Sequence, residues 1–160
     1  MSVSGLLQFL HVASAFVFVA GLMGRDVVLS RARVSSDIEV VRTLTSAAGP
    51  FDRFMVIPGS FAVVVFGLLT WWAEGIPLWG AGSRWLPVSL MVFASTIPLV
   101  PLIFLPRGVV FERALRDAVD QRRVTDDLTS ALHDPMVAFA RWYEIAVVAV
   151  VLLLMVTKPF

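Results

Sequence analysis

The chain has 160 residues, of which 58% are hydrophobic and only 16% charged, and its mean hydropathy is +0.85. Soluble domains are about 45–50% apolar and about 25% charged, so this composition excludes an ordinary water-soluble globule. The sequence contains no cysteine, which excludes disulfides and thiolate metal sites.

Four apolar blocks are separated by charged stretches, at residues 5–24, 54–72, 86–105 and 137–156. Each is roughly 20 residues long, enough for a helix to cross ~30 Å of hydrocarbon. We therefore predict an all-α fold. Residues 1–160 are expected to form a single membrane domain, a four-transmembrane-helix bundle built from two helical hairpins.

The basic residues are distributed unevenly over the three connecting segments. Eleven of the 13 border or fill the segments at 25–53 and 106–136, and only Arg84 and Lys158 lie elsewhere. The positive-inside rule places these two segments in the cytoplasm and both termini outside. Four tryptophans fall at the predicted outer interface and agree with this orientation: Trp71, Trp72, Trp79 and Trp85.

Short identities suggest that the hairpin is duplicated. Arg-x-Val-Val occurs at 25–28 and 107–110, and Leu-Thr-Ser-Ala at 44–47 and 128–131. Because both halves begin on the same side, they would be parallel repeats related by an axis along the membrane normal. The identities are few, and chance similarity is the alternative.

The segment at 106–136 has helical character, and Thr125 followed by two aspartates is typical of a helix start. Six arginines from Arg107 to Arg141 are balanced there by six acids from Glu112 to Asp134. Such a balance is typical of a solvated cytoplasmic face. It argues against nucleic-acid binding, which needs an unbalanced basic cluster.

His11 is the histidine inside a predicted span, and an ionisable group in hydrocarbon is a functional candidate by default. Its neighbours at helical spacing include Ser14 and Gly21, which predicts that it faces the bundle interior. The imidazole either donates a structural hydrogen bond to a facing helix or ligates haem iron. His133 lies on the predicted cytoplasmic side and cannot share that iron. Lys158, at the outer end, is a weak candidate for a sixth ligand.

Glu144 lies inside the fourth predicted span, with Arg141 three residues earlier. We predict a structural ion pair that orients this helix, with Arg25 or Arg53 as other partners. A proton relay is the alternative, but it would require a second titratable group deeper in the membrane.

Prolines and small residues shape the middle spans. Pro58 is expected to loosen the second span, and Pro98 and Pro101 the third, because proline lacks a backbone N–H. A stripe of small residues at Gly59, Val63 and Gly67 predicts close helix contact.

Three segments carry a family resemblance. Residues 11–25, residues 58–68, and the pair Arg141 and Glu144 with the ending Lys158-Pro159-Phe160 resemble helices one, two and four of the bacterial four-helix protoporphyrinogen oxidases and their copper-resistance-D-like relatives. Asp52-Arg53 followed by Pro58-Gly59 is most similar to an uncharacterised branch of small integral membrane proteins within that superfamily.

The resemblance implies a helical bundle in the bacterial cytoplasmic membrane that binds haem b, with His11 as iron ligand. The oxidases carry a histidine and a lysine after a Trp-Leu pair, whereas here Trp85-Leu86 is followed by Pro87 and Ser89. This departure leaves the oxidase activity, and whether the protein is an enzyme, open.

Three functions follow as hypotheses. The first is a haem- or porphyrin-binding membrane module, and the second is a non-catalytic membrane subunit or scaffold of the same fold. Copper handling is a minor third, because the sequence lacks clustered Met and His. The expected partners are the lipid bilayer and either another membrane protein or further copies of this chain.

Overall fold

The computed structural model describes residues 2–78, 80 and 82–159. The predicted interface residue Trp79 and the terminal Phe160 lie outside these described residues. Throughout the described part the chain forms helices, turns and loops without a β-strand, which confirms the all-α prediction. Two compact units divide it: the first hairpin unit, residues 2–32 and 43–76, and the second hairpin unit, residues 33–42 and 77–159.

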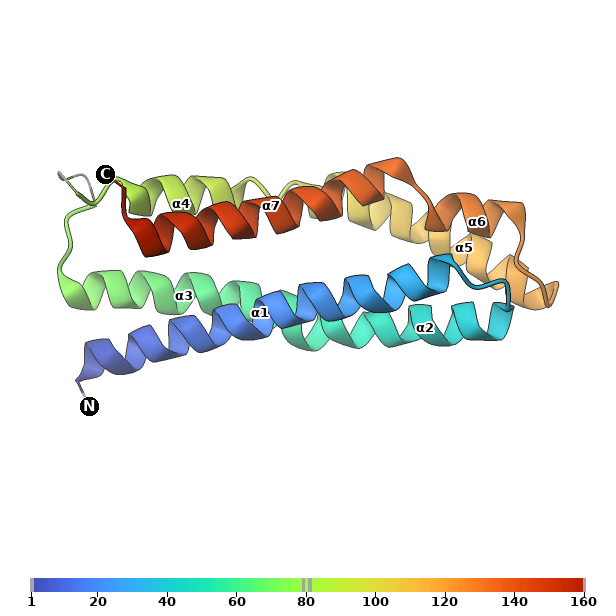
Figure 1. Ribbon diagram of the computed structural model, residues 1–160, viewed down its shortest axis with the longest axis horizontal. Coiled ribbons are helices and arrows are strands. Elements are labelled where there is room, and N and C mark those ends of the chain that lie inside the picture. Colours follow the sequence, from blue (N-terminus) through green and yellow to red (C-terminus); the bar gives the residue numbers. More distant parts are fainter. Residues whose placement is uncertain (1, 79, 81, 160) are drawn as a thin grey trace. The chain divides into compact units, whose positions relative to one another are not determined.

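The first hairpin unit contains the long helix α1 (Val3–Arg33) as far as Ala32, and a returning helical run from Thr43 onward. That run consists of α2 (Ile38–Phe51), the π-helical turn η1 (Asp52–Val56) and α3 (Ile57–Glu74). Figure 1 shows α1 lying alongside this run. The π turn ends two residues before Pro58, whose missing N–H and ring disfavour a regular helical turn there. Because α1 continues to Arg33 and α2 begins at Ile38, most of the predicted connecting segment at 25–53 is helical.

The predicted small-residue stripe packs against α1. An added Cβ at Gly59 would lie 3.1 Å from the backbone of Phe18, and one at Gly67 would lie 2.9 Å from Cε1 of His11. A side chain at either position would therefore push the helices apart. The close helix contact predicted from this stripe is confirmed.

The second hairpin unit also pairs two apolar segments, and Figure 1 shows α4 beside α7. At the charged end of the unit α5 packs on α6. Its elements are α4 (Trp85–Ala94), the π turn η2 (Val100–Phe104), α5 (Leu105–Asp120), α6 (Asp126–Leu132) and α7 (Pro135–Thr157).

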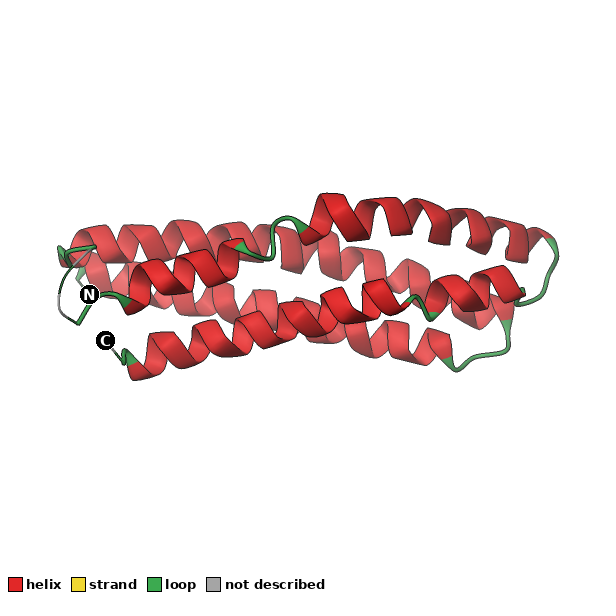
Figure 2. Ribbon diagram, turned by 90° about the horizontal axis from the view of Figure 1, so that it is seen from above, coloured by secondary structure: helices red, strands yellow, loops and turns green. Residues whose placement is uncertain are grey.

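The third predicted span is a broken helix. After Ala94 the backbone makes tight turns, with the N–H of Thr96 bonded to the Phe93 carbonyl and that of Ile97 to the Ala94 carbonyl. Pro98 has no N–H to continue the α-helical pattern, so the helix resumes only at η2. Figure 2 shows this interruption as a loop between helices.

The charged segments of the second hairpin unit have a small core of their own. Val41, Ala118 and Leu128 are fully buried. Thr125 caps α6 by accepting a hydrogen bond from the N–H of Leu128, which confirms the helix start predicted there. Arg33 Nε donates to the Leu132 carbonyl at the end of α6, and so attaches the beginning of this unit to α6.

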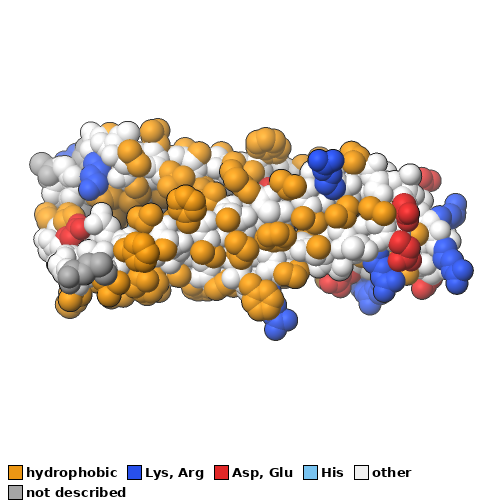
Figure 3. Space-filling model, turned by 60° about the horizontal axis from the view of Figure 1, so that its bottom comes forward, with side chains coloured by type: hydrophobic (Ala, Val, Ile, Leu, Met, Phe, Trp, Pro, Cys, Tyr) orange, Lys and Arg blue, Asp and Glu red, His pale blue; other side chains and the backbone are white. Residues whose placement is uncertain are grey.

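In the described part, three helical runs are long and apolar enough to cross a membrane, and they contain the first, second and fourth predicted spans: Val3–Arg33, Ile38–Glu74 and Asp126–Thr157. The third span is represented by the shorter apolar helix α4 and the segment that follows its break. On the face drawn in Figure 3, hydrophobic side chains cover a wide area and charged side chains gather toward one end. The exposed apolar surface is what a helix that contacts lipid requires.

Candidate functional site

His11 contacts the facing helix of its own unit. Its Nδ1 lies 2.9 Å from the Val63 carbonyl oxygen, between α1 and α3. A carbonyl only accepts, so Nδ1 is the protonated nitrogen in this pair. In a neutral imidazole, Nε2 then carries the lone pair. The predicted hydrogen bond to a facing helix is therefore present, and the second ring nitrogen keeps its capacity to accept.

His11 is half-buried, and its near neighbours include one glycine and one serine. Gly67 lies against the ring, and Ser14, the next polar residue along α1, donates its hydroxyl to the Leu10 carbonyl of the same helix. Since both local polar groups have a backbone partner, the orientation of the imidazole is set by the contact between α1 and α3.

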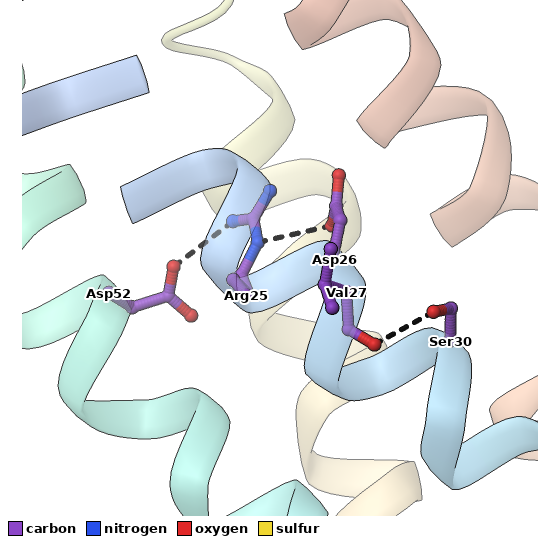
Figure 4. A network of polar contacts seen from close by, with 5 residues as sticks. All are labelled: Arg25, Asp26, Val27, Ser30 and Asp52. Carbon is purple, nitrogen blue, oxygen red and sulfur yellow. Dashed lines mark hydrogen bonds and ion pairs between the residues drawn. The ribbon is translucent and has the colours of Figure 1, made fainter. Parts of the chain in front are cut away.

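A second polar site in the first hairpin unit surrounds Arg25, which is buried (Figure 4). Its Nη1 donates to Oδ1 of Asp52 at 3.0 Å, and its Nε lies 3.5 Å from Oδ1 of Asp26. Asp26 is the next residue on α1, whereas Asp52 begins η1. One guanidinium thus joins the two arms of the hairpin where the apolar spans meet the charged segment.

The second hairpin unit contains a matching contact. Arg107 Nη1 donates to Oδ2 of Asp134 at 2.6 Å. The other oxygen of Asp134 accepts from the N–H groups of Met136 and Val137, so the same carboxylate also caps α7. This ion pair joins the beginning of α5 to the beginning of α7.

The remaining predicted site residues lie on or beside α7. Arg141 and Glu144 are both half-buried there, and the predicted ion pair between them, or with Arg25, stays a prediction. Lys158 follows α7, and its Nζ lies 5.2 Å from the centre of the Trp85 ring. A cation–π contact of this kind anchors the end of the helix to α4.

A site for a metal ion with several protein ligands is not found among the described residues, where no three His, Cys, Asp or Glu side chains come together. An open polar hollow of about 430 Å³ lies between α5 and α6 and is bordered mainly by aspartates. None of the predicted site residues lines it.

Three polar contacts were not predicted from the sequence. Two are the ion pairs of Arg25 with Asp52 and of Arg107 with Asp134, each separated by the same 27 residues. The third is the hydrogen bond between the hydroxyls of Ser95 and Tyr143, 2.7 Å apart, which ties the broken third span to α7. The repeated spacing was a signal that could have revealed the ion pairs.

The chain has long apolar helical runs, and polar groups such as His11 and Arg25 are hydrogen-bonded between paired helices. These features define a helical integral membrane protein. A family profile described as "Predicted integral membrane protein (DUF2269)" matches residues 5–159, and the chain belongs to that family. No curated protein and no solved structure matches the chain. The family assignment supports a membrane protein, and the relation to the oxidases and their copper-resistance-D-like relatives stays a prediction.

Proposed function

We propose that this protein binds haem b in the membrane through Nε2 of His11. The observation that carries the proposal is the contact between His11 Nδ1 and the Val63 carbonyl. Histidines that ligate metals generally donate their other ring N–H to a carbonyl or carboxylate, which fixes the tautomer and directs the lone pair. His11 and Val63 therefore fit the role of one iron ligand and the carbonyl that would orient it.

The chain's own residues would have distinct tasks at such a site. Val63 orients the imidazole, Gly67 leaves room for the ring, and the apolar side chains of α1 and α3 exclude water. When bound, haem would supply redox or haem-transfer chemistry. Lys158 remains the weaker proposal for a second ligand, because its ammonium group already lies over Trp85.

The test is the visible absorption spectrum of the full-length protein, purified from cells supplied with haem precursors. A Soret band is expected, and His11→Ala should abolish or strongly shift it while the protein remains in the membrane. His133→Ala is the matched control, since its Nδ1 also lies 2.9 Å from a backbone carbonyl, that of Thr129, but the residue is exposed. A spectrum that His11→Ala leaves unchanged would overturn the site.

A second candidate is a non-catalytic membrane subunit or scaffold, alone or as a homo-oligomer. It is favoured by the finding that His11, Arg25 and Ser95 all have partners within their own units. Absence of a Soret band in preparations supplied with haem would favour it. Copper handling, the minor third alternative, predicts stoichiometric copper in the same preparations.

For location, we propose the bacterial cytoplasmic membrane with four spans, the third of them broken, and both termini outside. The distribution of basic residues supports this orientation. The apolar length of residues 85–104, counted across the break, supports the fourth crossing.

A further inference from the structure

The two ion pairs have the same residue types, the same donor atom and the same spacing along the chain. In each, Nη1 of an arginine donates to a carboxylate oxygen of an aspartate 27 residues later. The second pair follows the first by 82 residues at both positions, from Arg25 to Arg107 and from Asp52 to Asp134. Each arginine lies where an apolar segment passes into a charged one, and each aspartate lies where the returning apolar segment begins.

The aspartates of the two pairs lie outside the sequence identities that suggested a repeat. Arg25 and Arg107 open the two Arg-x-Val-Val motifs, which recur at an offset of 82, but nothing in that motif requires the distant aspartate. Between the two partners, the first copy has 18 residues before its Leu-Thr-Ser-Ala segment and the second has 20. The separation of the partners is nevertheless 27 in both, so the ion pair is retained although the connecting segments differ.

We infer that the chain is a tandem duplication of one helical hairpin, and that Arg25–Asp52 and Arg107–Asp134 are two copies of one ion-pair clamp. The clamp joins the arms of each hairpin at the level where the apolar segments pass into the charged ones. A lone charge at the edge of an apolar span is costly, and pairing across the hairpin lowers that cost only when the arms are in register.

The duplication also separates shared residues from those present in one copy. At an offset of 82, His11 corresponds to Phe93, Asp26 to Gly108, Gly59 to Arg141 and Ala62 to Glu144. The clamps are common to both copies and therefore structural. The specialised role of the protein then belongs to the unshared ionisable residues, and a site built on His11 occurs once per chain.

Double-mutant cycles on the full-length protein in detergent test the clamps. Arg25→Gln with Asp52→Asn, and Arg107→Gln with Asp134→Asn, remove the charges, and asparagine still caps α7. Each single variant is expected to lower the midpoint of thermal unfolding. For a chain of this size, each kcal/mol lost from the free energy of unfolding lowers that midpoint by roughly 2–4 °C. Each double variant is expected to lose clearly less than the sum of its singles.

The exposed pair Glu39 and Arg42, 3.7 Å apart within α2, is the matched control, and its cycle is expected to be additive. If Arg25→Gln does not accumulate, Arg25→Lys keeps the charge and replaces it in the cycle. If the stability losses of the two single variants are additive in either hairpin, the inference of a shared clamp is wrong. An experimental structure provides the second test: superposing the hairpins should align Arg25 with Arg107 and Asp52 with Asp134, and any other alignment would overturn the duplication.

Discussion

The two hairpin units contain the same ion pair in opposite states of burial. In the first, the arginine side chain is 8% exposed and its aspartate 43%. In the second, the arginine is 49% exposed and the aspartate 11%. The partner that leaves water determines the cost of breaking the pair, because its charge cannot be solvated once the other is removed. Corresponding residues therefore carry different energetic weight in the two units.

Their first arms differ as well. α1 runs without interruption from Val3 to Arg33, whereas the corresponding stretch of the second unit is divided into α4, η2 and α5. At an offset of 82, Pro98 corresponds to Phe16, so proline content separates a continuous arm from a broken one. The same hairpin plan therefore accommodates both a continuous and an interrupted first arm.

The largest expected effect concerns the direction of the two hairpins in the membrane. A reporter active only in the cytoplasm should be active when inserted after Arg122, in the connection between α5 and α6, and silent when fused after Phe160. The reason is that the basic residues hold the segment at 106–136 inside. Insertion after Gly75 is the control and should be silent. Strong activity at Phe160 would invert the predicted orientation.

Removing the arginine from each clamp should lower the free energy of unfolding by a different amount in the two hairpins. Arg25→Ala removes the buried charge itself and leaves Asp52, which is 43% exposed, in reach of water, so the loss of the pair should cost about 1 kcal/mol or less. Arg107→Ala leaves the Asp134 carboxylate, which is 11% exposed, without its guanidinium and should cost about 3 kcal/mol, as for a broken buried pair. Denaturant unfolding in detergent measures both. Equal losses would mean that side-chain burial does not decide the cost.

Exchanging proline between the corresponding positions should change the arms in opposite directions. Phe16→Pro should cost about 3 kcal/mol, because it breaks a continuous helix at a side chain that is 77% exposed and so loses little packing. Pro98→Ala should restore an amide and increase protection from hydrogen exchange over residues 95–100, with a stability change of about 1 kcal/mol at most. Unchanged exchange would indicate that tertiary contacts, not Pro98, hold the break open.

The smallest effect is expected from two glycines of the first hairpin unit. Gly59→Ala places a methyl group 3.1 Å from the Phe18 backbone and should destabilise by about 1–2 kcal/mol. Gly49→Ala meets nothing within 4 Å and should stabilise α2 by about 0.5–1 kcal/mol. Thermal unfolding of the two variants measures both changes in stability. A stabilising Gly59→Ala would mean that α1 and α3 are farther apart than described.

Local features of the sequence predicted much of the fold. Thr125 was recognised as a helix start because the capping hydroxyl and the N–H that it bonds lie three residues apart. The stripe of Gly59, Val63 and Gly67 indicated a helix contact because helical spacing puts these residues on one face. His11 was recognised as a candidate because an ionisable group is rare within an apolar run.

The polar partners were harder to predict. Arg25 was considered as a partner of Glu144, and Asp52 was not considered, although it lies 3.0 Å away in the same unit. The two residues are 27 positions apart along the chain. They meet only because α1 packs against the run from α2 to α3 in a register that brings Arg25 opposite Asp52. The carbonyl that orients His11 belongs to Val63, whose side chain gives no sign of such a role.

By itself, the sequence determined that the chain is helical and belongs in a membrane, because composition and apolar length depend only on the residues present. The tertiary structure decided which polar groups meet: Val63 with His11, Asp52 with Arg25, and Asp134 with Arg107. It also decided which partner of each clamp is buried. Such contacts depend on the register of helices that are distant along the chain, and hydrophobic periodicity constrains the face of a helix but not its height against a neighbour.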